Sequence, residues 1–325
     1  HPSRTLLFLK SRTEHMATAF LFPGQGSQKV GMGQDLFERR PEARERFEAA
    51  NDVLGMDLTA IMFGNDTGDG SPEEELKRTD ITQPALYVHS MAAMAVLEAE
   101  GVEPDMVAGH SLGEYSAIAA AGALSFEDGL RVVRRRGELM ATAGADRPGA
   151  MAAVMGVDDN DVNAVCKAVS GGEHGVVQPA NYNAPGQIVI SGDEAAVAEA
   201  SDRIDGRVIP LPVSGAFHSP LMEYAREGLA EVLEAVDMHE PRCPVYLNVT
   251  ATETTEPDEI RRRLIDQLLS PVRWAQSLRA MHDAGATRFL EVGSGSVLRG
   301  LIRRTLGRGV EQIGAGTAEE IETLA

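Results

Sequence analysis

The feature that most constrains the fold is a Gly-x-Ser-x-Gly motif, Gly109-His110-Ser111-Leu112-Gly113, which lies between an apolar run and a run of small residues. The apolar run predicts a short buried strand, and the small residues predict a helix, so we expect Ser111 at a tight turn between them. Glycines at 109 and 113 leave room where the strand and the helix come closest. Such a turn presents a serine hydroxyl above a sheet edge, beside helix N–H groups that can meet an anion.

Two interpretations of this motif are open. Ser111 can be a nucleophile, or it can be the N-cap of the helix, with Glu114 as its capping-box partner. The motif alone does not separate them. The rest of the chain must supply, or fail to supply, a base and donors for an oxyanion.

Strand and helix patterns alternate along most of the chain. The predicted strands cover residues 18–22, 106–108, 245–248 and 288–292. The predicted helices cover residues 33–54 (interrupted near Pro41), 82–100 (opened by Thr82-Gln83-Pro84), 126–142, 220–235, 257–269 and 272–284, and a last helix follows the glycine-rich turn 293–296. This alternation predicts a mainly parallel sheet covered by helices on both faces.

The pattern changes between residues 145 and 210. Strands at 150–157, 176–180, 187–191 and 207–212 and helices at 158–169 and 193–204 give the order β-α-β-β-α-β, which is typical of a ferredoxin-like unit. The predicted fold class is therefore α/β. A large hydrolase-like domain, residues 16–144 and 211–325, carries an inserted ferredoxin-like domain, residues 145–210. We interpret residues 1–15 as an extension outside the fold, because Met16 directly precedes the first strand.

Composition excludes some classes of function. The chain has 49 acidic and 30 basic residues, for a net charge of −19, which argues against a nucleic-acid partner. This acidity is expected either of a protein adapted to high salt or of an ordinary acidic protein. No apolar run approaches the roughly 20 residues of a membrane helix. The two cysteines, Cys166 and Cys243, form no disulfide framework or metal cluster and fit a reducing cytoplasm.

His218 is the best candidate for a base. It follows a predicted strand and precedes a helix that starts at Pro220. The carboxyl end of a strand in a parallel sheet is where α/β proteins place their sites. A structural loop histidine is the alternative. His110 adjoins Ser111, and we expect it to point away.

An oxyanion needs N–H donors. The backbone of Leu112, directly after Ser111, supplies one in any such turn. The Gln25 backbone, between Gly24 and Gly26, can supply another. A dinucleotide-binding loop is excluded there, because Lys29 stands where the third glycine belongs.

Arg136 is expected to face inward. Its helical neighbours Val132, Val133, Leu139 and Met140 are all apolar. A buried guanidinium needs an anion, and its geometry suits a carboxylate. An internal Asp or Glu and a substrate carboxylate are both open as partners.

Five motifs occur in order along the chain: Phe22-Pro-Gly-Gln-Gly-Ser-Gln28, Gly109-His-Ser-Leu-Gly-Glu-Tyr-Ser116, Arg136-Gly137, Asn181-Tyr-Asn-Ala-Pro-Gly-Gln187 and Gly215-Ala-Phe-His-Ser-Pro-Leu-Met222. Together they resemble the motifs of malonyl-CoA:acyl carrier protein transacylases of bacterial fatty acid synthesis. The resemblance extends from about residue 16 to beyond residue 295, and the inserted ferredoxin-like unit agrees with the fold of that family.

The resemblance implies a role for each site residue. Ser111 is the nucleophile and His218 the base of a Ser–His dyad, with Gln25 and Leu112 as oxyanion donors. Four further residues are expected to bind or position the substrate: Arg136, Gln267, Asn183 and Phe217. Arg136 would bind the malonyl carboxylate, and the main-chain carbonyl of Gln267 would orient the histidine. Asn183 would lie near the site, and Phe217 would favour malonyl over branched substrates.

The implied reaction is ping-pong acyl transfer through a malonyl-serine, with no metal or redox cofactor. The expected partners are malonyl-CoA and acyl carrier protein, without nucleic acid or membrane, and the expected form is a cytoplasmic monomer.

An acidic carrier would need a basic patch. The candidates are Arg299, Arg303 and Arg304 or the exposed Arg131, Arg134 and Arg135. The alternatives are a serine esterase or thioesterase, a non-catalytic carrier-binding module, and a same-fold transacylase of a polyketide or polyunsaturated lipid system.

Overall fold

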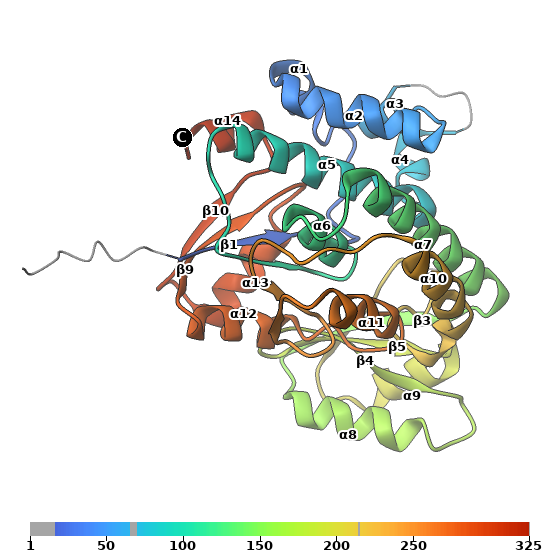
Figure 1. The fold of residues 1–325 in the computed structure, drawn as a ribbon. Coiled ribbons are helices and arrows are strands. Elements are labelled where there is room, and N and C mark those ends of the chain that lie inside the picture. Colours follow the sequence, from blue (N-terminus) through green and yellow to red (C-terminus); the bar gives the residue numbers. More distant parts are fainter. Residues whose placement is uncertain (1–16, 66–69, 214, 325) are drawn as a thin grey trace, which may run out of the picture.

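The computed structural model describes residues 17–65, 70–213 and 215–324 (Figure 1). The extension predicted at residues 1–15 lies outside them. The larger sheet has the strand order β10-β9-β1-β2-β7-β8 and is parallel except for the last pair, β7 with β8. Its strands are β1 (Ala17–Phe22), β2 (Met106–Gly109), β7 (Val245–Tyr246), β8 (Glu253–Thr254), β9 (Ala286–Glu291) and β10 (Glu311–Gly314). The prediction of a mainly parallel sheet is confirmed.

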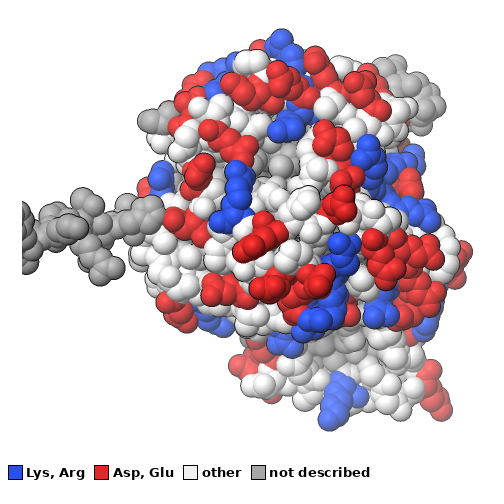
Figure 2. All heavy atoms as spheres, in the orientation of Figure 1, with Lys and Arg blue, Asp and Glu red and all other residues white. Residues whose placement is uncertain are grey.

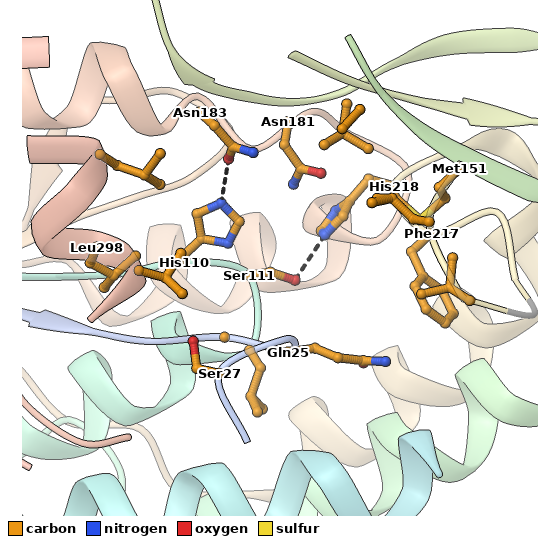
Figure 3. Close-up of a pocket in the computed structure, with 18 of the residues that line it drawn as sticks. Gln25, Ser27, His110, Ser111, Met151, Asn181, Asn183, Phe217, His218 and Leu298 are labelled. Carbon is orange, nitrogen blue, oxygen red and sulfur yellow. Dashed lines mark hydrogen bonds between the residues drawn. The ribbon is translucent and has the colours of Figure 1, made fainter. Parts of the chain in front are cut away.

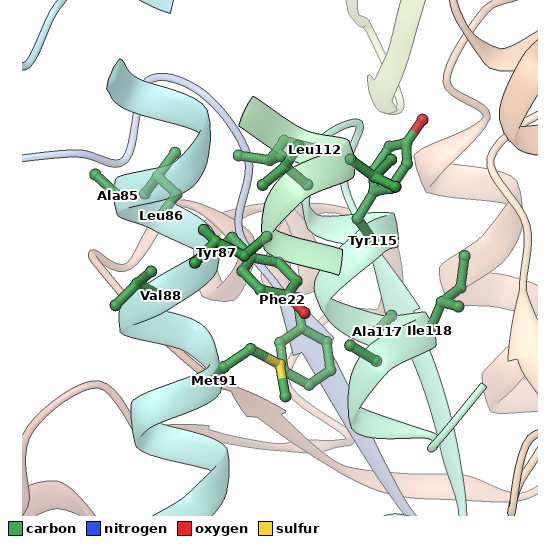
Figure 4. Packing of buried hydrophobic residues seen from close by; sticks show 14 of the residues in the cluster. Phe22, Ala85, Leu86, Tyr87, Val88, Met91, Leu112, Tyr115, Ala117 and Ile118 are labelled. Atoms are coloured by element: carbon green, nitrogen blue, oxygen red, sulfur yellow. The ribbon is translucent and has the colours of Figure 1, made fainter. Parts of the chain in front are cut away.

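Helices cover both faces of this sheet because β1 alternates its side chains between two cores. Phe20 and Phe22 point into the larger core, and Ala19 and Leu21 point into the smaller one. The larger core is formed with α2 (Pro41–Leu54), α5 (Thr79–Ala99), α6 (Gly113–Ala120), α7 (Phe126–Asp146), α10 (Glu223–Ala235) and α11 (Pro257–Gln267). The smaller core is formed with α12 (Trp274–Asp283) and α13 (Val297–Leu306). Figure 4 shows Phe22 packed between α5 and α6.

A second sheet holds the inserted unit. Its strands are β3 (Ala150–Met155), β4 (Val177–Ala184), β5 (Gln187–Gly192) and β6 (Arg207–Pro210), with α8 (Asp159–Val169) and α9 (Glu194–Arg203) between them. The order β4-β5-β3-β6 is antiparallel throughout, which is the ferredoxin-like arrangement predicted from the element order. The unit buries its own hydrophobic cluster. The domain limits at 145 and 210 stay a prediction.

The free edge of β4 joins the inserted unit to the large domain. Val272, just before α12, donates its backbone N–H to Ala180 and accepts from Tyr182, at 2.8 and 2.9 Å. These bonds hold β4 beside the carboxyl ends of the parallel strands. The asparagines of β4, Asn181 and Asn183, are thereby brought to the same cavity as Ser111.

Helix α5 begins earlier than the sequence predicts. It starts at Thr79 rather than at Thr82, so Pro84 lies inside it. Pro84 has no N–H to donate to the Asp80 carbonyl four residues earlier. The side chain of Arg134, on α7, donates to that carbonyl at 2.7 Å instead. A tertiary contact therefore compensates for the proline, and the local sequence does not reveal it.

The elements that the sequence did not predict are short. They are α3 (Leu58–Phe63), α4 (Pro72–Glu75), α14 (Ala318–Glu322), β8 and β10. Two to six residues carry too little periodicity to be recognised. The predicted interruption near Pro41 is confirmed, because α1 (Gln34–Arg39) ends before α2 begins there. The helix expected from Pro220 opens with a 3₁₀ turn, η1 (Pro220–Met222).

Candidate active site

Ser111 lies at the turn between β2 and α6, as the motif predicts. Its backbone has φ of 52°, in the left-handed region. The two glycines of the motif are required by close packing: a Cβ on Gly109 would lie 1.9 Å from Gly113, and a Cβ on Gly113 would lie 2.0 Å from the Phe22 carbonyl. The turn is therefore pressed against both the first helical turn and the end of β1, with the serine at its tip.

His218 meets the Ser111 hydroxyl. Its Nε2 lies 2.8 Å from Ser111 Oγ (Figure 3). Its Nδ1 lies 2.9 Å from the main-chain oxygen of Gln267. A carbonyl can only accept, so Nδ1 carries the hydrogen and Nε2 is free to accept the serine proton. Burial, together with the charge of Arg136, lowers the pKa of His218 to about 3. The imidazole is therefore neutral, which is the form that a general base needs.

The capping interpretation of Ser111 and Glu114 is wrong. The N-cap of α6 is Leu112, without a side-chain cap. The Glu114 carboxylate instead accepts the backbone N–H of Asn248 at 2.8 Å and a hydrogen from the Gln267 side-chain amide. The backbone N–H of Ser111 donates to Asn248 Oδ1 at 2.8 Å. Both groups serve long-range contacts that the local Ser-x-x-Glu pattern does not reveal.

Arg136 faces inward, as its helical neighbours predict, and only 1% of it is exposed. Its Nη1 donates to Gln83 Oε1 at 2.8 Å, and its Nη2 donates to Gln267 Oε1 at 2.9 Å and to Ser111 Oγ at 3.2 Å. The guanidinium carbon lies 5.4 Å from the centre of the Tyr115 ring. The three acceptors are all uncharged, and in the described part of the chain its Nε has no partner. A buried cation without a direct counter-charge next to the serine is suited to bind an anion.

The backbones of Gln25 and Leu112 lie on the same cavity as Ser111. The loop after β1 reaches this position because a Cβ on Gly24 would lie only 2.3 Å from the His110 carbonyl. Within the described residues, no hydrogen-bond acceptor meets the backbone N–H of Gln25 or of Leu112. Both N–H groups are therefore available to a bound oxygen atom.

The cavity has a volume of about 270 Å³ and lies between the large domain and the second sheet. Of the predicted site residues, those that line it are Gln25, Ser111, Leu112, Arg136, Asn183, Phe217 and His218. Figure 3 shows Gln25 across the cavity from the asparagines of β4. Gln267 is fully buried and contacts Ser111, Arg136 and His218 from behind, without lining the cavity.

His110 was expected to point away from Ser111, but its ring lines the same cavity. Its Nε2 lies 2.7 Å from Asn183 Oδ1, and its ring makes a T-shaped contact with the ring of Trp274. Two further site residues, Asn248 and Gln83, were not predicted. Asn248 ends a predicted strand, so its place at a carboxyl end was an available signal. Gln83 is a polar residue on a buried helix face, which is unusual without a partner.

The candidate basic residues occupy different settings. Arg303 and Arg304, on α13, are exposed, and Arg304 donates to the side chain of the cavity residue Gln187 at 2.6 Å. Arg134 is half-buried rather than exposed, and it pairs with Asp80 and Glu138. The remaining candidates pair with carboxylates: Arg131 with Asp128, Arg135 with Glu138, and Arg299 with Glu291 and Glu320.

Acidic side chains spread over the face in Figure 2, with basic ones between them. Among the described residues, no cluster of three or more His, Cys, Asp or Glu side chains could hold a metal ion. Across the same ranges, each helix is too short or too polar to span a lipid bilayer.

Comparison with known proteins agrees with this geometry. The family model described as acyl transferase domain matches residues 19–323. A malonyl CoA-acyl carrier protein transacylase of Bacillus subtilis (strain 168) is 46% identical over 308 residues, 94% of this chain and 95% of that protein. The transacylase of Staphylococcus aureus (strain COL) is 41% identical over 94% of this chain and 97% of its own length.

Two solved structures have the same fold. An acyl carrier protein S-malonyltransferase of Vibrio cholerae has a TM-score of 0.88 at 38% identity, covering 95% of this chain and 99% of that one. A malonyl-transacylase in complex with a type II PKS acyl-carrier protein also has a TM-score of 0.88 at 38% identity, covering 94% and 98%.

Proposed function

The chain belongs to the acyl transferase domain family, and from that premise we propose that it transfers malonyl from malonyl-CoA to the phosphopantetheine thiol of acyl carrier protein. The transfer passes through a malonyl ester of Ser111 and serves fatty acid biosynthesis. The observation that carries the proposal is Arg136, a buried guanidinium with only uncharged acceptors, 3.2 Å from the Ser111 hydroxyl. A malonyl group attached at Ser111 has its free carboxylate within reach of this cation.

In the first half-reaction, His218 Nε2 accepts the Ser111 proton while Oγ attacks the thioester carbonyl carbon. The carbonyl oxygen becomes an oxyanion, which the backbone N–H groups of Gln25 and Leu112 stabilise. The intermediate collapses as the carbon–sulfur bond breaks. The departing sulfur takes the proton from His218, so free coenzyme A leaves and the malonyl-serine remains.

The second half-reaction runs in the opposite direction. His218 accepts the proton of the phosphopantetheine thiol, whose sulfur attacks the ester carbonyl carbon of the malonyl-serine. The same two N–H groups stabilise the oxyanion. The bond to Ser111 Oγ breaks, and Oγ recovers its proton from His218. This sequence of bonds needs neither a metal ion nor a redox cofactor.

Arg136 and Phe217 account for the choice of acyl group. An acetyl group would leave the buried Arg136 cation unpaired, which costs binding free energy that malonyl does not lose. Phe217 lines the cavity and is 7% exposed, so its ring restricts the room for a branched acyl group. Asn183 acts on the opposite side of the cavity, where it holds the His110 ring.

Gln267 positions the catalytic groups. Its main-chain oxygen orients His218, and its side chain bonds the Ser111 carbonyl at 2.9 Å as well as Arg136. It touches the nucleophile, the base and the cation at once. We therefore assign it a positioning role.

The exposed end of α13 is proposed as the docking surface for the acidic carrier protein. Arg303 and Arg304 lie there, and Arg304 contacts Gln187 on the cavity wall. A carrier bound at this point would have its thiol close to the cavity. We propose that the protein is a monomer and that it works in the cytoplasm; the free thiols of Cys166 and Cys243 fit a reducing compartment.

A polyketide system is the second candidate setting, because one of the similar structures is a malonyl-transacylase with a type II PKS carrier. The chemistry at Ser111 is the same in both settings, and only the carrier differs. An esterase has no use for a buried arginine beside the nucleophile, and the family match does not support one.

Mass spectrometry of the intact protein tests the proposal. After mixing with malonyl-CoA, we expect a malonyl adduct on Ser111 that persists in water and disappears when an acyl carrier protein with a free phosphopantetheine thiol is added. Acetyl-CoA and methylmalonyl-CoA should give little adduct. Rapid hydrolysis without transfer to the thiol would favour the esterase, and a comparison of fatty acid and polyketide carriers would separate the two settings.

A further inference from the structure

Glu114 is a fully buried carboxylate that the proposed mechanism does not use. It lies in the first turn of α6, directly behind Ser111. One of its oxygens accepts the backbone N–H of Asn248, and the other accepts a hydrogen from the side chain of Gln267. Burial raises its pKa to about 7. A carboxylate in such a place destabilises the fold unless its contacts compensate, so its presence calls for a reason.

The contacts of Gln267 supply that reason. Its Nε2 donates one hydrogen to the Ser111 carbonyl and the other to Glu114, while its Oε1 accepts from Arg136. If this amide were rotated by half a turn, its oxygen would face the Ser111 carbonyl and the Glu114 carboxylate. Its NH₂ group would then face the donors of Arg136. Glu114, together with the Ser111 carbonyl, therefore determines which end of the amide Arg136 meets.

We propose that Glu114 is a positioning residue for malonyl selectivity, which holds Arg136 beside Ser111 through the Gln267 amide and supplies its counter-charge from one amide away. This inference rests on the proposed function. A carboxylate in direct contact with Arg136 would pair with it and compete with the malonyl carboxylate. With the neutral amide of Gln267 in between, the positive charge is partly compensated while the guanidinium stays available to substrate.

The contacts require a carboxylate at position 114. Asn248 and Gln267 both donate to it, and only a carboxylate offers two acceptors at this spacing. In Glu114→Gln, the introduced amide has one oxygen acceptor and one NH₂ donor. Either the Asn248 N–H or the Gln267 NH₂ group then faces another donor instead of an acceptor. We expect the Gln267 amide to reorient and Arg136 to lose an acceptor.

The test is the loading of Ser111 by malonyl-CoA and by acetyl-CoA, measured separately. For Glu114→Gln we expect kcat/KM with malonyl-CoA to fall at least about 10-fold, chiefly through KM, because a hydrogen bond to a charged group is lost. Loading by acetyl-CoA should not fall, so the ratio of malonyl to acetyl loading decreases. Labelling of Ser111 by a small uncharged fluorophosphonate should continue, since this reagent does not use Arg136.

Glu291→Gln is the matched control. Glu291 is also a buried carboxylate with two N–H donors, the backbones of Leu298 and Arg299, each at 3.0 Å. Its replacement should lower stability without changing the ratio of malonyl to acetyl loading. A merely structural role for Glu114 would give the same result in both variants.

The fluorophosphonate label reports whether the Glu114→Gln variant is folded with a reactive Ser111. If this labelled variant keeps the wild-type ratio of malonyl to acetyl loading, the role of Glu114 is overturned. If the wild-type protein itself takes no malonyl, the proposed function fails instead.

Discussion

The side chain of Asn248 binds the backbone around Ser111 at two points. Its Oδ1 accepts the Ser111 N–H at 2.8 Å, and its Nδ2 donates to the Gly109 carbonyl at 2.7 Å. Ser111 has φ of 52°, which costs a residue other than glycine about 1–2 kcal/mol. Asn248 therefore stabilises the strained conformation that presents the nucleophile.

Replacing Asn248 by alanine should weaken both the fold and the nucleophile. The Ser111 N–H and the Gly109 carbonyl would each lose a buried partner, which should lower the free energy of unfolding by about 2–4 kcal/mol. Urea denaturation measures this loss, and fluorophosphonate labelling of Ser111 should slow in parallel. Asn248→Asp keeps an acceptor for the Ser111 N–H, so its free energy of unfolding should lie between those of the wild-type protein and the alanine variant. An unchanged denaturation midpoint would contradict the role of Asn248.

Arg136→Ala should lose malonyl loading and gain acetyl loading. The malonyl carboxylate would be buried without its charged partner, so kcat/KM should fall by about 100-fold or more. Arg135→Ala is the control, because this neighbour on α7 is exposed and pairs with Glu138 rather than with a group at the site. Malonyl preference that survives in Arg136→Ala would exclude the assigned contact.

The reaction of Ser111 with an uncharged fluorophosphonate should change little between pH 7.5 and pH 5. The folded-state pKa of His218 is lowered to about 3, so the base stays unprotonated over this range. With an ordinary pKa of 6.5, only about 3% of the imidazole would be neutral at pH 5, and the rate would fall about 30-fold. A fall of that size would show that the pKa of His218 is not lowered.

The same lowered pKa affects stability. Between pH 6.5 and about pH 3 the unfolded chain takes up a proton at His218 that the folded chain does not. The contribution of this residue to stability is therefore complete above pH 6.5 and decreases as the pH falls through that range. His218→Gln should reduce the pH dependence of the denaturation midpoint between pH 6.5 and about pH 3. An unchanged dependence would show that the pKa of His218 is not lowered in the folded chain.

Charge reversal at Arg303 and Arg304 should raise the KM for acyl carrier protein and leave malonyl loading from malonyl-CoA unchanged. Both arginines are on the exposed part of α13, and Arg304 donates to the side chain of the cavity residue Gln187. The same reversal at Arg131 and Arg135 on α7 is the comparison. If only that second pair raises the KM, the carrier docks over α7 instead.

The melting temperature should rise between low salt and molar salt. A net charge of −19 makes the folded surface repel itself, and added ions screen this repulsion. Thermal denaturation monitored by circular dichroism in both conditions measures the shift. A melting temperature that does not rise would leave an ordinary acidic protein as the better description.

Much of the fold could be predicted because the period of the hydrophobic pattern is local. The β-α-β-β-α-β order and the alternation of strands and helices around it could be predicted from short runs along the chain, and both sheets agree with them. The start of α5 was not readable, because Pro84 is accommodated by Arg134, a residue of another helix. The short strands β8 and β10 depend on pairing with neighbours in the sheet.

The sequence by itself determined which residue types stand where chemistry is possible: a serine at a strand–helix turn, a histidine after a later strand, and an arginine on the apolar face of α7. These follow from spacing along one element, which the backbone geometry converts into a direction. Only the tertiary structure decided how they meet. Ser111 and His218 are 107 residues apart, and Arg136 and Gln267 are 131 apart. Glu114 reads as a helix cap in the sequence but lies behind the site, because its partners come from distant segments that only the packed sheet brings together.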